Sequence, residues 1–326
     1  MILVTGGAGF IGSNLVAALC ERGRPVVVCD HLEKGDKWGN VAKHDLLDLV
    51  LPDRLGDWLT GQRRLDVIYH LGAISATTAT DADLIFDTNV RFSTMLWDWC
   101  AQSGTRFIYA SSGATYGYGS AGFDDDASAE GLARLRPLNA YGWSKHFFDR
   151  RVARRVAARD VAPPQWVGLK FFNVYGPNEY HKGSQQSVVA QKYPLVVSNQ
   201  PVTLFQSHHP DYPDGGQLRD FVFVDDCVDV MLWLLDQPGV NGLFNLGTGK
   251  ARSFADLARA IAEAMGCRSQ IEFIPTPEAI RPNYQYFTEA RMEKLRSAGY
   301  AKSFTALEEG VRRYVQEYLS KPDRYR

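Results

Sequence analysis

The stretch that decides the fold is "MILVTGGAGFIGSNLVAALCERG", residues 1–23. Its apolar start, 1–5, leads into a glycine-rich turn, and an amphipathic helical pattern follows. The turn carries Gly6, Gly9 and Gly12 as G-x-x-G-x-x-G. The first glycine permits a tight turn, the second lets the backbone approach a pyrophosphate, and the third lets the helix pack closely on the strand. Because the N-terminus of a helix offers free N–H groups to phosphates, the stretch predicts a dinucleotide-binding site.

A second strand pattern, "PVVVCD" at 25–30, ends in an acid. Asp30 lies 18 residues after Gly12, where a carboxylate can bind the ribose hydroxyls of the adenosine. Its alternative is an ordinary strand-end acid in a turn. Asp30 favours NAD, whereas Lys34 and Lys37 could neutralise the 2′-phosphate of NADP, so the residues alone leave the cofactor open.

Further strand patterns, "DVIYHLGA" (66–73) and "RFIYASS" (106–112), alternate with helical ones. This rhythm predicts an α/β fold with a doubly wound, Rossmann-like parallel sheet, whose ligands bind at the carboxyl ends of the strands. We expect residues 1–172 to form the dinucleotide-binding domain. Residues 173–326 should form mainly a smaller C-terminal α/β substrate domain, with segments near 220–247 returning to the first.

The composition excludes several classes of function. The 326 residues contain 36 Lys plus Arg and 37 Asp plus Glu, a balance unlike that of a general nucleic-acid-binding or membrane-surface protein. No apolar run is long enough to span a bilayer. We expect the chain to start as a core strand without a signal peptide. Five scattered cysteines without a C-x-x-C pair indicate reduced thiols and a cytoplasmic protein. We expect no metal site and no nucleic-acid or membrane partner.

The segment "NAYGWSKHFFDRRVARRVAAR" (139–159) predicts a helix with Tyr141 and Lys145 on one face. A phenol has a pKa near 10, and an ammonium group one turn along favours its phenolate form. Ser112, at the end of the preceding strand, can hydrogen-bond the same substrate hydroxyl. Together they predict an alcohol-oxidising site, in which Tyr141 takes the O–H proton while hydride passes to a nicotinamide cofactor.

The chain carries the motifs "TGGAGFIGSN", "HLGA", "SSGATYG", "YGWSK", "FFNVYGPN" and "RDFVFVDD". By these motifs it resembles, over nearly its whole length, the extended short-chain dehydrogenase/reductases, most of which act on nucleotide-activated sugars. The dehydratases of that family carry an Asp-Glu pair directly after the catalytic Ser or Thr. Here Gly113 and Ala114 stand there, which argues against a 4,6-dehydratase.

A finer resemblance is to the ADP-L-glycero-D-manno-heptose 6-epimerases, through "LGAISATTATDADLIFDTN" (71–89), "FFNVYGPNEYHKGS" (171–184), "LFQS" (204–207) and "FNLGTGKARSF" (244–254). It implies an isomerase that inverts C6 of ADP-D-glycero-D-manno-heptose for lipopolysaccharide core synthesis. The reaction would pass through a transient 6-keto intermediate with tightly bound NADP, NAD being possible, in a homo-oligomer. A 4-epimerase or reductase acting on another nucleotide sugar, and a non-catalytic dinucleotide-binding sensor, remain as alternatives.

Inversion requires the planar ketone to present its other face, so a second proton donor is needed. The resemblance assigns Tyr141 to one side and Lys182, of the His-Lys-Gly-Ser motif, to the other. It implies cofactor contacts by Gly6, Gly9, Phe10, Ile11, Gly12, Asp30, His31, Lys37, Leu71, Gly72, Ala73, Ile74, Ser75, Asn89, Lys145 and Val174. It implies substrate contacts by Asn173, Ser184, Gln191, Phe205, Gln206, Ser207, Arg219 and Tyr284.

Some of these positions carry a further expectation. Arg219 should meet the diphosphate, since guanidinium suits bidentate phosphate contacts; its alternative is a salt bridge to Asp220 or Asp225. Gln191 stands where the resemblance suggests a histidine. The acidic run 124–126 should be a solvated loop.

Overall fold

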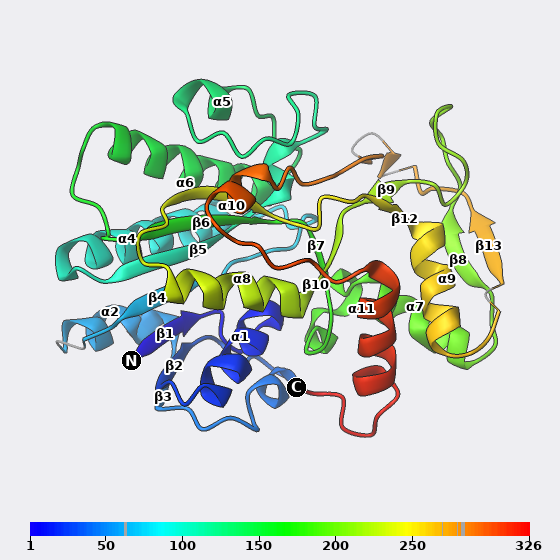
Figure 1. The fold of residues 1–326 in the computed structure, drawn as a ribbon, viewed down its shortest axis with the longest axis horizontal. Helices are drawn as coiled ribbons and strands as arrows, with labels where there is room; N and C mark the ends of the chain where they lie inside the picture. Colours follow the sequence, from blue (N-terminus) through cyan, green and yellow to red (C-terminus); the bar gives the residue numbers. More distant parts are fainter. Residues whose placement is uncertain (62–63, 269, 279, 282–283) are drawn as a thin grey trace.

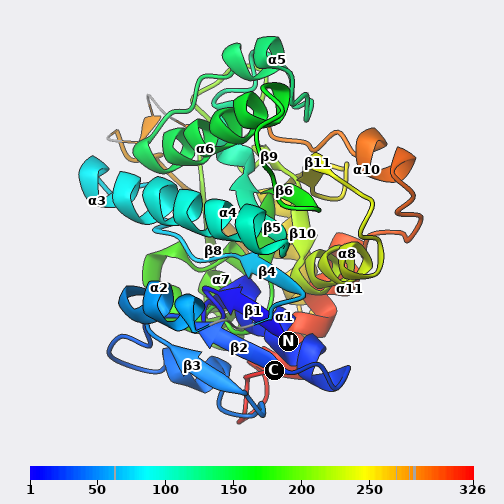
Figure 2. The same ribbon diagram turned by 90° about the vertical axis from the view of Figure 1, so that its left-hand side faces the viewer.

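The computed structural model describes residues 1–61, 64–268, 270–278, 280–281 and 284–326. A seven-stranded parallel sheet forms its centre, with helices on both sides (Figure 1 and Figure 2). Its strands, in spatial order, are β11 (Gly242–Leu246), β6 (Trp166–Phe171), β5 (Arg106–Ser112), β4 (Val67–His70), β1 (Ile2–Thr5), β2 (Val26–Cys29) and β3 (Asp48–Val50). The predicted doubly wound sheet is confirmed.

The strand order reverses direction at β1, which lies between β2 and β4. In register, Thr5 at the end of β1 is level with Cys29 on one side and His70 on the other. Open α/β sheets bind ligands beside such a switch point, at the carboxyl ends of the strands. The fold therefore places the predicted dinucleotide site between the segments that follow β1 and β4.

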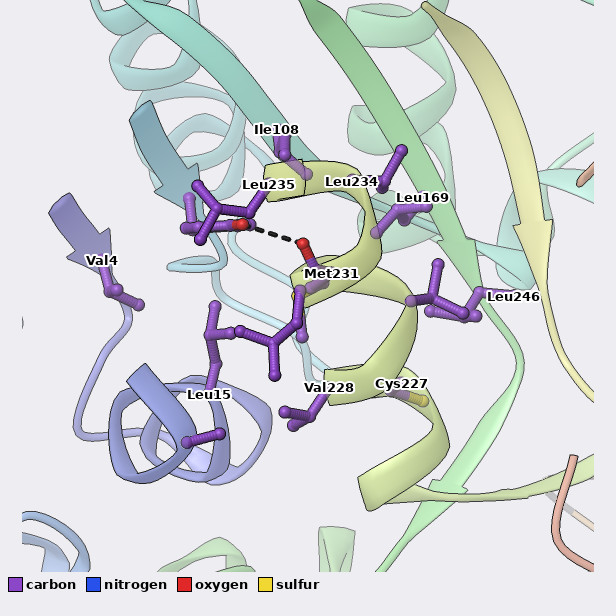
Figure 3. Packing of buried hydrophobic residues seen from close by; sticks show 14 of the residues in the cluster. Val4, Leu15, Ile108, Leu169, Cys227, Val228, Met231, Leu234, Leu235 and Leu246 are labelled. Carbon is purple, nitrogen blue, oxygen red and sulfur yellow. Dashed lines mark hydrogen bonds between the residues drawn. The ribbon is translucent and has the colours of Figure 1, made fainter. Parts of the chain in front are cut away.

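Side chains of β1 alternate between two hydrophobic clusters, as the period of two in a strand requires. Ile2 and Val4 join a cluster with α1 and α8, whereas Leu3 joins one with α2, α4 and α6. Figure 3 shows α8 packed on the sheet through Cys227, Met231 and Leu234. The helices around this sheet are α1 (Phe10–Glu21), α2 (Pro52–Thr60), α3 (Ala82–Phe86), the π-helix η2 (Asp87–Arg91), α4 (Phe92–Ser103), α5 (Ala129–Ala133), α6 (Ala140–Ala157) and α8 (Val224–Asp236), with short 3-10 turns η1 (Lys37–Asn40) and η3 (Gly113–Tyr116).

The C-terminal half adds short strands and helices beside the sheet, many of them at the right of Figure 1. A third cluster, around Val189, Leu257 and Val311, holds α7, α9 and α11 together. The elements are β7 (Asn173–Tyr175), η4 (Tyr180–Gln185), α7 (Val188–Val197), β8 (Val202–Phe205), β9 (Leu218–Arg219), β10 (Phe221–Phe223), β12 (Arg252–Ser253), α9 (Phe254–Ala264), β13 (Ile271–Ile274), α10 (Glu293–Ser297), α11 (Leu307–Tyr314) and η6 (Val315–Leu319). Within the described ranges, no helix combines the length and apolar character needed to cross a membrane.

The expectation that the acidic run 124–126 is a solvated loop is wrong for its middle residue. Asp124 and Asp126 are exposed, but Asp125 is buried. Its carboxylate accepts the backbone N–H of Asn245 at 2.8 Å, and Lys294 donates to its backbone carbonyl at 2.9 Å. Because Asn245 lies on the edge strand β11, its buried N–H has no sheet neighbour on that side and needs another acceptor.

Candidate active site

A cavity of about 670 Å³ opens at the carboxyl ends of β1, β4 and β5. The glycine-rich turn, the loop after β4, the end of β5 and the face of α6 form part of its wall. Residues 171–175, 181–182 and 185–188 form another part. One cavity therefore collects most of the motifs that the sequence singled out.

The glycine-rich turn is shaped for close approach. Gly6 has a φ of +67°, and a Cβ on it would lie 2.5 Å from the backbone nitrogen of Gly72. A Cβ on Gly12 would lie 2.8 Å from the carbonyl carbon of Gly6 and 3.0 Å from Cα of Gly7. Side chains would thus separate α1 from the turn and the turn from the segment after β4. The glycine lining fits a diphosphate bound at the N-terminus of α1.

The expected ribose-binding carboxylate, Asp30, lies on the cavity wall with Glu33 and Lys37. One of its oxygens accepts the N–H of Ala8 at 2.9 Å, and the other pairs with the Lys37 ammonium at 3.0 Å. Lys37 also donates to the carbonyl of His31 at 2.7 Å and pairs with Glu33 at 3.1 Å. Two acids and one lysine therefore line the cavity at the end of β2.

Asn89 supports the wall without lining it. It is buried, accepts the N–H of Ile74 at 2.9 Å and donates to the Ile74 carbonyl at 3.0 Å. It also donates to Ser144 of α6 at 3.0 Å. The side chain therefore fixes the loop of residues 71–75 against the helix that carries Tyr141.

Tyr141 and Lys145 lie in the first turns of α6, which Asn139 caps by accepting the N–H of Gly142 at 2.8 Å. Tyr141, Lys145 and Ser112 all line the cavity, and Tyr141 and Ser112 are hydrogen-bonded. Burial raises the pKa of Tyr141, and the hydrogen bond with Ser112 opposes that shift. Burial lowers the pKa of Lys145 to about 8, so this side chain loses its proton only slightly above neutral pH.

The His-Lys-Gly-Ser motif forms η4 on another part of the wall. Gly183 has a φ of +53°, and this bend turns the chain sharply between Lys182 and Ser184. The Lys182 ammonium lies 5.3 Å from the ring centre of Phe10, the first residue of α1. Burial lowers the pKa of Lys182, and the carboxylate of Glu179 opposes that shift. Lys182 therefore lies in the cavity, next to the glycine-rich turn.

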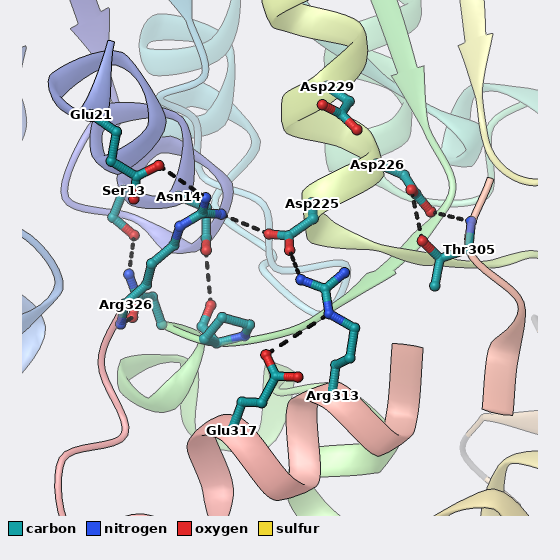
Figure 4. A network of polar contacts seen from close by, with 12 residues as sticks. Ser13, Asn14, Glu21, Asp225, Asp226, Asp229, Thr305, Arg313, Glu317 and Arg326 are labelled. Carbon is teal, nitrogen blue, oxygen red and sulfur yellow. Dashed lines mark hydrogen bonds and ion pairs between the residues drawn. The ribbon is translucent and has the colours of Figure 1, made fainter. Parts of the chain in front are cut away.

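Three asparagines attach the loop before η4 to the helix α1 and to the turn η1. Asn14 donates to the Pro177 carbonyl at 2.9 Å, and Asn178 donates to Ser13 at 3.0 Å. Asn40 donates to the Asn178 carbonyl at 3.1 Å. Figure 4 shows this region of α1, with Arg326 beside Ser13 and Asn14. Sequence reasoning missed these contacts, because each joins residues from distant parts of the chain.

A second group of side chains adjoins the cavity through Phe254, which lines it. The guanidinium of Arg219 lies 5.6 Å from the ring centres of both Phe254 and Tyr284, and Phe205 packs against Tyr284 at 6.2 Å. Arg219 donates to the carbonyls of Leu218 and Gln285. Among the described residues it forms no ion pair, so the salt bridge considered as its alternative is wrong. A buried, unpaired guanidinium surrounded by rings can accept an anionic ligand.

Most predicted residues meet in the cavity, and some do not. The cavity is lined by Gly6, Gly9, Phe10, Ile11, Gly12, Asp30, Lys37, Leu71, Gly72, Ala73, Ile74, Ser75, Ser112, Tyr141, Lys145, Asn173, Val174 and Lys182. Its wall does not include His31, Asn89, Ser184, Gln191, Phe205, Gln206, Ser207, Arg219 and Tyr284. Gln191 donates instead to the carbonyls of Ser184 and Gln186, so it supports the loop around η4.

Several lining residues escaped sequence reasoning. They are Glu33, Ser111, Phe172, Gln185, Gln186, Ser187, Phe221 and Phe254. Neighbours in sequence offered a signal for Ser111, which precedes Ser112. Phe221 and Phe254 come from segments after residue 200, and only the fold brings them to the wall.

The fold and the cavity match a class of protein, the α/β enzymes that bind a nicotinamide dinucleotide at the switch point of a parallel sheet. The chain belongs to the NAD dependent epimerase/dehydratase family, whose model matches residues 2–247.

Similar proteins agree with this family. The chain is 50% identical to an ADP-L-glycero-D-manno-heptose-6-epimerase of Nitratidesulfovibrio vulgaris (strain DP4) over 327 residues, covering 99% of each chain. Among solved structures, an ADP-L-glycero-D-manno-heptose-6-epimerase of Helicobacter pylori matches with a TM-score of 0.80 and 26% identity, over 97% of this chain and 95% of that one. A UDP-glucose 4-epimerase of Thermus thermophilus, in complex with NAD, matches with a TM-score of 0.74 and 29% identity, over 96% and 97%.

Proposed function

We propose that the protein inverts C6 of ADP-D-glycero-D-manno-heptose, giving the L-glycero epimer for lipopolysaccharide core synthesis. The activities named for its relatives support the substrate and the position of inversion. The observation that carries the mechanism is that Tyr141 and Lys182, two ionisable groups from different elements, line the same cavity as the glycine-rich turn. Inversion through a ketone needs two proton-transfer groups, and a simple dehydrogenase needs one.

Each group has a distinct task in this proposal. Tyr141, with Ser112, hydrogen-bonds the C6 hydroxyl of one epimer and takes its proton. Lys182 serves the hydroxyl of the other epimer, after the 6-keto sugar has turned its opposite face. The bound nicotinamide dinucleotide supplies hydride uptake and return at C6. Lys145, one turn along α6, stabilises the phenolate of Tyr141 through its positive charge. Burial raises the pKa of Tyr141, so the phenolate needs this support.

The residues after Ser112 favour epimerisation over dehydration. Gly113 and Ala114 start η3, and neither offers an acid or a base. Elimination of water needs such a pair beside the sugar. Because Gly113 and Ala114 cannot provide it, we propose that the ketone is reduced again and not dehydrated.

The test uses both epimers of the ADP-heptose separately with enzyme that carries its cofactor. Tyr141→Phe should lose oxidation of one epimer, and Lys182→Met should lose oxidation of the other, each by about 10²- to 10⁴-fold. Reduced cofactor, followed by absorbance in a single turnover, reports each half-reaction, and NMR of the sugar reports inversion. Loss of the same half-reaction in both variants would reject the two-base proposal.

Two matched controls separate chemistry from folding. Lys192→Met and Tyr193→Phe make the same substitutions on α7, outside the cavity wall. Both variants should epimerise at nearly the wild-type rate. If the wild-type protein turns over UDP- or GDP-sugars but leaves the ADP-heptose unchanged, the proposed substrate is wrong.

For the cofactor, we propose that the site accepts NADP as well as NAD, with Lys37 facing the 2′-phosphate. The exposed partner Glu33 can release the lysine, whereas Asp30 is held by Ala8. Lys37→Met should weaken NADP binding by about tenfold or more relative to NAD, as for the loss of one charge-assisted contact. An unchanged ratio of the two dissociation constants would exclude Lys37 from this role.

For the substrate, we propose that Asn173 meets the sugar and that Arg219 meets the diphosphate. The exposed loop carrying Ser184 would close on the sugar with Gln191 behind it. Phe205 and Tyr284 would contact the ADP end, together with the neighbouring Gln206 and Ser207. Support comes from the ring contacts that join Arg219 to Phe254 on the cavity wall.

We further propose a cytoplasmic homo-oligomer. The five cysteines are free thiols, as expected in a reducing compartment. Trp143 of α6 is 42% exposed and packs against the rings of Phe86 and Phe147, and Leu84 of α3 is 53% exposed. Exposed apolar side chains of this size suit contact with a second copy of the chain. Light scattering should give a mass above that of one chain, and Trp143→Glu should lower it; a monomeric wild type would reject the proposal.

A further inference from the structure

A fully buried ion pair lies next to the helix turn that carries Lys145. Asp149, one turn further along α6, and Lys170 of β6 are both completely buried, with 3.5 Å between the ammonium and a carboxylate oxygen. Burying two charges is costly, and apolar residues of similar size would usually stabilise the interior at least as well. None of the proposed catalytic steps uses this pair directly, so stability and direct catalysis do not explain why charged residues stand here.

The carboxylate is held by more than the lysine. Ser111 donates to one of its oxygens at 2.6 Å, and Tyr109 donates to the other at 3.0 Å. Both donors belong to β5, whose last residue is Ser112. Asp149 therefore links the strand end that carries Ser112 to the helix that carries Lys145.

Lys170 extends the link to η3, the turn that follows Ser112. Its ammonium donates to the hydroxyl of Thr115 at 2.9 Å and lies 4.4 Å from the ring centre of Tyr116. Its charge balances Asp149, so the carboxylate can stay ionised although burial raises the pKa of Asp149.

We propose that Asp149 is a positioning residue for the reaction, whose clamped carboxylate keeps Lys145 in its ammonium form beside Tyr141. The inference rests on the roles proposed above for Tyr141 and Lys145. Asp149 would act through Lys145, because its own carboxylate is enclosed by β5 and Lys170 and does not line the cavity.

Asp149 acts on both groups: it opposes the lowering of the pKa of Lys145, and it raises the pKa of Tyr141, which works against the phenolate. The other charges nearby leave Asp149 as the group that favours the ammonium form of Lys145. Burial lowers the pKa of Lys145, and Asp149 is the carboxylate, among the described residues, that opposes this shift. His70 of β4 also faces Lys145, but burial lowers its pKa to about 3, which makes it neutral. The phenol of Tyr109 is neutral as well, because burial and Asp149 raise its pKa far above the ordinary value.

The groups around Lys170 balance one another. Asp125 and Lys294, of opposite charge, both act on Lys170. His146 of α6 is neutral, since burial and Lys170 lower its pKa to about 4. Asp149 is therefore the charged group that most affects the pKa of Lys145.

The test is the pH profile of kcat for Asp149→Asn in the enzyme with its cofactor bound. Without the carboxylate, Lys145 loses its proton at lower pH, so the basic limb should move down by about one pH unit while KM changes little. Asp226→Asn is the matched control. Asp226, at the start of α8, is also buried, and its carboxylate accepts the backbone N–H of Thr305 (Figure 4). It does not line the cavity. The control should leave the basic limb in place.

A double variant covers the case in which Asp149→Asn does not fold. Asp149→Asn with Lys170→Met removes both charges together and leaves no uncompensated charge in the interior. Its basic limb should also move down, because the carboxylate acts on Lys145 more strongly than Lys170 does. A basic limb at the wild-type pH in the folded variants would overturn the inference. If Tyr141→Phe turned over normally, the proposed mechanism would fail first, so the two failures can be told apart.

Discussion

Gly12→Ala tests whether α1 packs on the glycine-rich turn as closely as the structure requires. The added Cβ would lie 2.8 Å from the carbonyl carbon of Gly6 and 3.0 Å from Cα of Gly7. These are backbone atoms that cannot rotate away, so the strain should reach the upper end of overpacking costs, about 3 kcal/mol. A helical alanine recovers about 1 kcal/mol. The net loss of unfolding free energy should therefore be about 2 kcal/mol.

Gly56→Ala is the matched substitution in another helix, α2. Gly56 is exposed, and a Cβ there would meet nothing within 4 Å, so this variant should gain about 0.5–1 kcal/mol. Urea unfolding measures both changes, and a cofactor titration should show weaker binding for Gly12→Ala alone. Equal midpoints for Gly12→Ala and the wild type, or equal losses in the two variants, would refute the close packing of α1 on the turn.

Three further outcomes are expected. The initial rate should fall as the pH rises past about 8, because deprotonation of Lys145 removes the ammonium that supports the phenolate; a rate that stays level well above pH 8 would contradict this. Asn178→Ala should lower the unfolding free energy by about 2 kcal/mol in urea, since Asn178 has a φ of +72° and donates to Ser13, and Asn178→Gly should recover the backbone part. Asp220→Ala should cost about 3 kcal/mol in the same assay, because its buried carboxylate accepts three backbone N–H groups; a loss below about 1 kcal/mol would argue against that network.

Sequence patterns were sufficient where the relevant contacts are local. The glycine spacing after the first strand predicted a turn whose close approach the structure reproduces at Gly12. The four-residue spacing of Tyr141 and Lys145 placed both on one face of α6, and both line the cavity. Helix and strand periods of this kind depend on neighbouring residues, so they can be read without the fold. The division of the chain into two domains stays a prediction.

Tertiary structure decided the contacts between distant segments. Residues 173–187 come after α6 in the chain, with the strand β6 between them. Hydrogen bonds of Asn14 and Asn178 nevertheless attach this segment to α1, and Lys182 thereby lies next to Phe10. No local pattern marks these pairs, because a buried polar group is satisfied by whichever partner the packing brings within reach. The buried pair of Asp149 and Lys170 could not be predicted for the same reason. In the sequence both look like ordinary charged residues of a helix and a strand, and only the fold removes them from water.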